Sequence, residues 1–358
     1  MYVIKICLLF FTLVLIWSCS SDISKPGYDE IIIYPAPPEP TKIQYLTHFS
    51  TSIDVTGEQS GIMNYVAGEE EELTIIKPYG ISIYNGRIYI CDTILGGIEI
   101  IDLPNEAFEI LQPKGLGKFK KPINCYKDAD GKLYVVDAER TQVMIFDSLD
   151  NYITAFGEDT LEKPTDIFVT DESIYVADLK DRNIKVFSKN DYSIVKIIGD
   201  DNLNEKIRIY QPTNIYVKED KIYISDFGDF RIKIYNTSGE FVDTVGSYGR
   251  NLGQFIRPKG VAVDDDLNLY VVDAAFENIQ IFNKNGQLLM FFGGTYKGVG
   301  DMWLPAKVII DYENLEYFQK YVYSGFELKY LIFVTNQYGP DKINVYGFVE
   351  EKELQNQN

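Results

Sequence analysis

Short runs of alternating apolar and polar residues repeat along most of the chain. After each of six prolines, spaced 42 to 48 residues apart, comes a run rich in β-branched and aromatic residues, which favour strands. A second run ends in an acid or an amide, a third alternates with a period of two, and a fourth leads to a glycine. The six prolines are Pro78, Pro122, Pro164, Pro212, Pro258 and Pro305. Four short strands in about 45 residues are typical of one propeller blade, so the pattern predicts an all-β, six-bladed β-propeller.

The last unit lacks a fourth strand of its own. The segment 43–49 reads as a fourth strand without a blade, so we expect it to pair with 342–348 and close the ring. Closure removes the free edges that an open array of sheets would expose. Two insertions break the repeat: residues 50–74, expected to form a long acidic loop, and residues 312–327, in which a short helix is predicted from Glu313 to Tyr321.

An acid or amide ends each second strand, at Asp92, Asp137, Asp178, Asp226, Asp273 and Asn336. One such residue per blade is typical of a structural cap, in which the carboxylate accepts backbone N–H groups of the following loop. The alternative is a ring of oxygen ligands for a hard cation such as Ca²⁺. We favour the cap and expect no metal or other cofactor.

The residue two positions after each proline is also restricted in type. The six residues are Gly80, Asn124, Asp166, Asn214, Gly260 and Lys307. Five of the six are types that tolerate left-handed or turn backbone. The pattern therefore predicts that conformation at this position.

The N-terminus has the composition of a secretory signal. Residues 1–18 begin with a short basic stretch and continue with an apolar run too short to span a membrane. The segment Ile16-Trp17-Ser18-Cys19 resembles a lipobox, although Trp17 stands where a smaller residue is usual. We expect lipidation of Cys19 and a location in the cell envelope, on the periplasmic side or at the cell surface. An ordinary signal peptide or an uncleaved anchor is the alternative.

The residues after the predicted signal fall into three segments of different composition. Residues 19–41 form a Pro-rich tether, residues 42–349 the propeller, and residues 350–358 a polar tail. Removal of residues 1–18 takes away one Lys and no acid, which leaves 33 basic against 53 acidic residues. This large negative net charge argues against a nucleic-acid partner and against adsorption to anionic lipid. The lipid anchor is therefore the expected membrane attachment.

One repeat shows a family resemblance most clearly. It reads Arg257-Pro-Lys-Gly-Val-Ala-Val-Asp264, then Leu269-Tyr-Val-Val-Asp273 and Ile279-Gln-Ile-Phe-Asn-Lys-Asn-Gly286. These segments are similar to the NHL repeat, and six matches cover residues 75–348. The last blade and the Pro-rich lead-in also resemble NHL lipoproteins of bacteria rich in multihaem c-type cytochromes. The resemblance implies an NHL-type propeller and an envelope protein as partner, possible redox complexes included.

Few residues suited to catalysis are present. His48, in the predicted closing strand, is the only histidine, and a surface or edge position is expected for it. The lyases that resemble NHL propellers depend on histidine, and Ser-His-Asp or Cys-His catalysis lacks a convincing base here. Cys91 and Cys125 occupy apolar repeat positions and are expected to be buried free thiols. No haem motif occurs, and we find no catalytic motif.

Basic residues precede the repeat prolines in most blades. Four cations around one channel mouth would attract an anionic ligand or an acidic segment of a partner, unless they merely offset nearby acids. The residues at this position are Lys77, Lys121, Lys163, Gln211, Arg257 and Leu304. Loops of the same face contribute further candidate contacts, Arg140, Asp181, Asp229, Phe230 and Phe276.

Three functions are compatible with these observations. The first is a non-catalytic binding or scaffold protein that presents a loop face to a protein partner. The second is a lactonase or hydrolase that uses a Ca²⁺-type ion, for which three or more acids should surround an open channel centre. The third is a carbohydrate or peptide sensor, for which aromatic rings should lie exposed beside polar groups. The absence of catalytic motifs favours the first.

Overall fold

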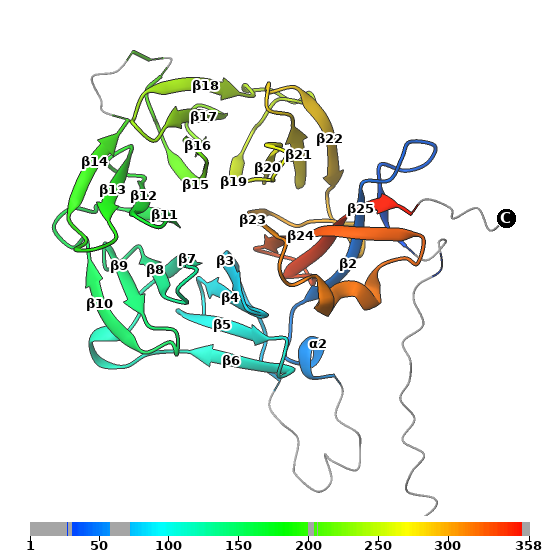
Figure 1. The fold of residues 1–358 in the computed structure, drawn as a ribbon, viewed down its shortest axis with the longest axis horizontal. Coiled ribbons are helices and arrows are strands. Elements are labelled where there is room, and N and C mark those ends of the chain that lie inside the picture. The colour runs from blue at the N-terminus through cyan, green and yellow to red at the C-terminus, as the bar shows by residue number, and fades with distance from the viewer. Residues whose placement is uncertain (1–26, 28–30, 58–71, 200–203, 206, 353–358) are drawn as a thin grey trace, which may run out of the picture.

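Six antiparallel sheets surround a central axis in the computed structural model, which describes residues 27, 31–57, 72–199, 204, 205 and 207–352 (Figure 1). The six-bladed, all-β propeller predicted from the repeats is therefore confirmed. The predicted signal 1–18, Cys19, tether residues 20–26 and 28–30, and the end of the tail lie outside the described residues.

Five blades contain four strands each, in sequence order from the axis outward. Blade one is β3 (Pro78–Tyr84), β4 (Arg87–Asp92), β5 (Gly97–Asp102) and β6 (Ala107–Leu111). Blade two is β7 (Pro122–Lys127), β8 (Leu133–Asp137), β9 (Gln142–Phe146) and β10 (Tyr152–Phe156). Blade three is β11 (Pro164–Val169), β12 (Ser173–Asp178), β13 (Asn183–Ser188) and β14 (Ile194–Ile198). Blade four is β15 (Pro212–Lys218), β16 (Lys221–Asp226), β17 (Arg231–Asn236) and β18 (Phe241–Val245). Blade five is β19 (Pro258–Val263), β20 (Leu269–Asp273), β21 (Asn278–Phe282) and β22 (Leu288–Gly293).

Blade six joins the two ends of the chain. Its order is β23 (Pro305–Asp311), β24 (Phe326–Asn336), β25 (Ile343–Glu351), β2 (Ile43–Phe49) and β1 (Ile33–Tyr34). Strands β2 and β25 pair antiparallel, from Ile43 opposite Phe348 to Phe49 opposite Ile343. The predicted closure of the ring by 43–49 and 342–348 is confirmed.

Some boundaries differ from those expected. Strand β1 lies within the predicted tether, and β25 continues two residues into the predicted tail. The expected acidic loop contains a short helix, α2 (Ile53–Thr56), and its residues 58–71 lie outside the described part. The predicted helix of the last blade is a 3₁₀ helix, η4 (Leu315–Tyr321), which begins two residues late. It does so because the Asp311 carboxylate accepts the Asn314 N–H at 2.9 Å and fixes a turn first.

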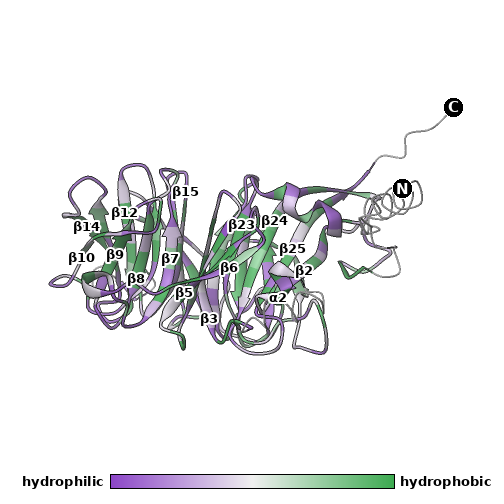
Figure 2. Ribbon diagram, turned by 90° about the horizontal axis from the view of Figure 1, so that it is seen from below, coloured by the Kyte–Doolittle hydropathy of each residue, from purple (hydrophilic) through white to green (hydrophobic). Residues whose placement is uncertain are grey.

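The core lies between neighbouring blades. Every residue of β8 and of β20 is buried, whereas the outermost strands such as β6 and β14 are partly exposed. Seen edge-on, the molecule is a flat disc whose strands are largely apolar (Figure 2). Cys91 and Cys125 are buried in it as free thiols. Within the described ranges, no helix has the length and apolar character needed to cross a membrane.

The disc has two faces, which we name by their loops. The first strand of each blade begins, and the second strand ends, at what we call the Asp-loop face, which carries the repeat acids. The hairpins from first to second strand and the loops from third to fourth strand form the opposite face, which we call the hairpin face. The direction of the strands thus decides which side chains reach each mouth of the channel.

Candidate functional site

The repeat aspartates organise the Asp-loop face. Each is fully buried, and Asp137 shows the pattern: it accepts the backbone N–H groups of Lys120 (2.7 Å), Lys121 (3.0 Å), Glu139 (3.2 Å) and Arg140 (3.0 Å). One pair of donors precedes the first strand of the blade, and the other pair follows the second strand. A carboxylate whose oxygens accept several backbone N–H groups is occupied by these hydrogen bonds and is not free to bind other ligands.

The other repeat acids make equivalent contacts. Asp92, Asp178 and Asp273 each accept N–H groups from both segments. Asp226 accepts two from the first segment and pairs with the buried ammonium of Lys233 at 3.2 Å. In blade six, Asn336 accepts the N–H of Trp303 at 3.3 Å. The geometry is that of a structural cap.

The caps also fix the backbone of the basic positions. The N–H groups of Lys77 (2.6 Å), Lys163 (3.0 Å) and Gln211 (2.8 Å) are bound by the aspartates of their own blades, as are those of Lys121 and Arg257. Because these bonds use only the backbone, the side chains of these residues extend from a fixed backbone on the Asp-loop face. Lys121 approaches Glu139 at 3.8 Å, and both side chains are well exposed.

Three cations converge at one side of the mouth. Lys259, immediately after Pro258, is mostly buried, and burial together with the positive charges of Arg257 and Lys77 lowers its pKa to about 8. Its ammonium lies 3.2 Å from the Gln337 side-chain oxygen and over the Tyr79 ring. Sequence reasoning missed Lys259, because its position after the proline holds no charge in the other blades.

Among the described side chains, no acid lies within ion-pair distance of Lys77, Arg257, Lys259 or Lys163. Lys77 instead contacts the exposed Tyr338, with its ammonium 3.2 Å from the hydroxyl and 5.0 Å from the ring centre. Among the described residues, the cations of this part of the ring therefore form no direct ion pair with an acid.

Aromatic side chains surround the same mouth. Trp303 and Tyr338 are both 47% exposed, and Tyr296 stacks on Trp303. Phe230 packs against Tyr248, which is 66% exposed, with ring centres 4.8 Å apart. Phe276 is half-buried in the loop that Asp273 caps. The sequence pattern singled out Phe230 and Phe276 but not the more exposed tryptophan and tyrosines, which lie outside the repeated positions.

Three predicted contact residues are partly engaged within the fold. Arg140 donates to the Lys118 carbonyl at 2.9 Å and to the Gln142 side chain. Asp181 pairs with the buried Lys185. Asp229 pairs with Lys233 at 3.0 Å. These residues shape the loops, and less of each is available to a partner than the sequence suggested.

A polar ring fills the channel axis between the two mouths. It consists of the residues two positions after each proline, and the left-handed backbone predicted there is wrong. None of these residues has a positive φ. Space near the axis explains the restricted types, because a Cβ on Gly80 would lie 2.3 Å from the Asn124 side chain and one on Gly260 would lie 2.8 Å from the Lys307 Cα.

An ion pair stands at the centre of this ring. The Lys307 ammonium lies 2.5 Å from Asp166 Oδ2, and both residues are buried. The same carboxylate accepts the N–H groups of Ile167 at 2.9 Å and Ile215 at 2.8 Å. Asn214 adds a longer contact at 3.3 Å.

The residues present do not fit a Ca²⁺-type site. Asp166 is the only acid of the axial ring, and its oxygens already bind an ammonium and backbone N–H groups. Ca²⁺ requires six or more oxygen ligands, several of them carboxylates. Across the part of the chain that the structure describes, no three His, Cys, Asp or Glu side chains gather as a metal site would require.

His48 lies in the closing strand, away from the channel. Its Nδ1 is 2.8 Å from the Tyr45 hydroxyl, and its Nε2 is 3.6 Å from Asp341, in the loop between β24 and β25. The imidazole thus joins β2 to the last blade at a half-buried edge position.

Comparison with known proteins indicates the fold but not a family. No protein-family model matches the chain, and no curated protein matches it. A Bacteroides thetaiotaomicron structural genomics protein of unknown function superposes with a TM-score of 0.58 at 16% identity, over 86% of this chain and 76% of that one. A Xanthomonas campestris gluconolactonase gives 0.55 at 14% identity, over 90% and 97%.

A further solved structure is similar over most of its length. A streptogramin B lyase gives a TM-score of 0.54 at 13% identity, over 88% of this chain and 89% of that one. At such low identity these likenesses concern the fold alone. The chain is a six-bladed β-propeller whose structural neighbours include a gluconolactonase and a streptogramin B lyase.

Proposed function

We propose that the protein is a non-catalytic scaffold of the cell envelope, anchored through Cys19, which binds an acidic segment of a protein partner at its Asp-loop face. The observation that carries the proposal is the cluster of Lys77, Arg257 and Lys259, which forms no ion pair with any described carboxylate and lies beside exposed aromatic rings.

The charge of the cluster is the first argument. Like charges held close together repel one another, and burial makes the ammonium of Lys259 harder still to protonate. A bound carboxylate would relieve both effects, because it supplies the opposite charge in a partly desolvated site. In a chain of strongly acidic composition, a local positive mouth also steers an acidic segment toward this face.

The neighbouring aromatic residues are the second argument. Tryptophan, tyrosine and arginine dominate the binding energy of many protein interfaces. Trp303, Tyr338 and Tyr248 are each about half exposed or more on the same face, and loops on a rigid scaffold present them. The mouth therefore offers apolar anchors next to charges, as a protein partner requires.

The lactonase or hydrolase alternative receives less support. Such an enzyme would need three or more acids around an open channel centre. The described axial ring contains one acid, Asp166, and it is paired with Lys307. The likeness to a gluconolactonase at 14% identity concerns the fold. The lipid anchor and the envelope location rest on the sequence alone, and a redox complex as partner rests on the resemblance to NHL lipoproteins.

Affinity purification of the tagged protein from mildly crosslinked envelopes, followed by mass spectrometry, tests the proposal. We expect a stoichiometric partner whose recovery falls strongly when Lys77, Lys163 and Arg257 are changed to Glu. The matched control is Lys284→Glu, an exposed lysine in a third-to-fourth-strand loop of the hairpin face. Labelling with radioactive palmitate, with and without Cys19→Ser, tests the anchor separately.

Two outcomes would contradict the proposal. Either no partner accompanies the protein, or a partner is retained equally by the triple variant and the control. The affinity of a purified partner, measured at increasing salt concentration, gives a second readout. It should fall, because exposed charge contacts weaken as ionic strength rises.

A further inference from the structure

A cavity opens at the hairpin face, at the mouth opposite the cationic cluster. Its volume is about 550 Å³, and the innermost strands β3, β7, β11, β15 and β23 line it. Sites for small ligands commonly measure about 300–1,000 Å³. Lys307 contributes to its lining, so the axial ion pair with Asp166 separates this cavity from the Asp-loop face.

Three aromatic rings form one wall of the cavity. Tyr126, Phe168 and Tyr216 occupy the same repeat position, four residues after the proline, in three successive blades. The ring centres are 4.9 Å apart in the first pair and 5.0 Å apart in the second, and the planes are steeply inclined. Tyr312 adds a fourth ring at the rim, where its hydroxyl accepts the N–H of Asp265 at 2.9 Å.

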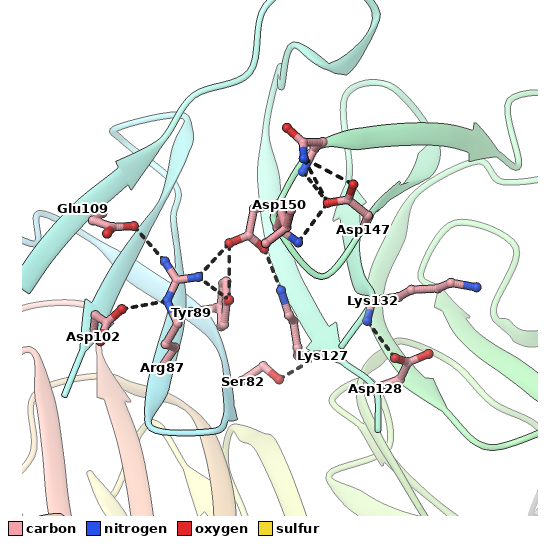
Figure 3. Close-up of polar contacts among 12 residues, drawn as sticks. Ser82, Arg87, Tyr89, Asp102, Glu109, Lys127, Asp128, Lys132, Asp147 and Asp150 are labelled. Carbon is pink, nitrogen blue, oxygen red and sulfur yellow. Dashed lines mark hydrogen bonds and ion pairs between the residues drawn. The ribbon is translucent and has the colours of Figure 1, made fainter. Parts of the chain in front are cut away.

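The lysines of the lining do not present their charge to the cavity. The Lys127 ammonium is turned to Asp150 at 2.6 Å, and that carboxylate is also bound by Arg87 and Tyr89 (Figure 3). The Lys307 ammonium is bound by Asp166. Both cations are therefore compensated by buried or nearly buried acids.

Acidic residues surround the opening. The connections from first to second strand carry exposed carboxylates in five blades, among them Asp130, Asp171, Glu172, Asp265, Asp266 and Glu313. Within the described parts of these connections, the bases are Lys132 and Lys320. Just outside them, Lys218 pairs with Asp265 at 2.6 Å and Lys189 with Asp130 at 3.6 Å, which leaves the other named carboxylates without an ion pair among the described residues. The acids lie close enough to affect the rings: burial first, and then Asp265 and Asp264, raise the pKa of Tyr216 to about 12.

We propose that this cavity binds a small organic cation, whose alkylammonium group lies against the aromatic wall within the acidic rim. The face of an aromatic ring carries negative charge density and attracts an ammonium group, most strongly where water is excluded. Carboxylates at the rim raise the local concentration of cations. A neutral sugar would use the rings but not the rim, and an anion would be repelled by it.

This site is separate from the one invoked under the proposed function. It lies on the other face, has the opposite charge, and takes a small molecule where the Asp-loop face takes an acidic segment of a protein. A variant that loses binding of the protein partner can therefore still be tested for binding of the organic cation, and the reverse.

Isothermal titration of the full chain with choline tests the inference. The control ligand is 3,3-dimethylbutan-1-ol, which has the same shape without the charge, and sodium chloride at equal ionic strength controls for salt. We expect choline to bind at one site and the neutral alcohol to bind about tenfold more weakly or not at all.

Variants locate the site. Phe168→Leu keeps an apolar side chain of moderate size but removes the middle ring, and should weaken choline binding about tenfold. Asp171→Asn combined with Glu313→Gln changes two exposed carboxylates that form no ion pair among the described residues, and should weaken binding and flatten its salt dependence. Tyr338→Leu, an aromatic change on the Asp-loop face, serves as the matched control and should leave choline binding unchanged.

Three results would overturn the inference. Choline gives no binding at its highest usable concentration, the neutral alcohol binds as tightly as choline, or Tyr338→Leu weakens binding as much as Phe168→Leu does. Thermal melting of each variant shows whether it is folded, and the doubly substituted rim variant carries the test if Phe168→Leu does not fold.

Discussion

Lys307 and Asp166 form an ion pair across the axis of the propeller, with 2.5 Å between Nζ and Oδ2. They belong to blades six and three, which lie on opposite sides of the ring (Figure 1). The pair thus connects the blade that contains both chain ends with the blade farthest from it.

Breaking this pair from one side should destabilise the protein strongly. Asp166→Asn leaves the buried Lys307 without its counter-charge, for which about 3–5 kcal/mol of unfolding free energy is expected to be lost. Adding Lys307→Met should restore a large part of that loss, because no uncompensated charge remains. Urea unfolding of the two single variants and the double variant measures the coupling. Additive losses would show that the two residues do not act as a pair.

The second prediction concerns Glu99, which is 1% exposed in β5 beside Asp92. Burial, and then the Asp92 carboxylate, raise the pKa of Glu99 to about 9. The folded state therefore keeps a proton that the unfolded state releases near pH 4.5. Stability should fall as pH rises from about 4.5 to about 9, and Glu99→Gln, which cannot ionise, should remove that fall. Melting temperatures of both proteins across this range should diverge with rising pH; parallel curves would contradict the prediction.

Lys259 should give the opposite dependence. Its pKa is lowered from 10.5 to about 8 by burial and by Arg257 and Lys77, so the unfolded state takes up a proton at a higher pH than the folded state does. Stability is then lost as pH falls from about 10.5 to about 8, and stays low below that. Lys259→Gln should melt at a higher temperature than the parent at pH 7, with the difference vanishing above pH 10.5. A constant difference at all pH values would indicate a packing effect instead.

The caps of the Asp-loop face supply a fourth prediction. In Asp273→Asn one oxygen becomes an NH₂ group that faces backbone N–H donors, and a loss of about 2 kcal/mol is expected from the unmatched donors. Asp266→Asn, an exposed change in the same blade, should be nearly neutral. Chemical denaturation of both variants checks the difference. Equal stability of the two would mean that the cap contributes little.

The repeated features of this protein could be predicted from its sequence. Period-two alternation and the recurring prolines occur six times, and the second-strand acid five times with Asn336 in the sixth blade. An exception in one blade therefore does not change the predicted fold. The closure by 43–49 followed from counting, since one strand lacked a blade and one blade lacked a strand. The caps followed from the tendency of aspartate to bind nearby backbone N–H groups.

What differs between blades could not be predicted in the same way. Lys259, Tyr338 and Trp303 carry much of the candidate site. Lys259 and Tyr338 stand at positions where the other repeats give no similar residue, and at the position of Trp303 only Tyr210 is also aromatic. Their proximity depends on how loops of different blades meet around the axis. The residue two after each proline illustrates the same limit: its restricted types reflected crowding at the axis, and sequence reasoning attributed them to backbone conformation.

The pairing of β2 with β25 makes the order of synthesis matter. Strand β2 is made before any of the first five blades, and its hydrogen-bonding partner is made after all of them. Through that interval the growing chain carries an unsatisfied edge, which invites pairing with other molecules. A polypeptide that stops before Ile343 would retain it permanently, because β25 supplies pairing to both β24 and β2. The last strand therefore completes the sheet only when the whole propeller has been made, and its absence would leave β24 and β2 without a neighbour on that side.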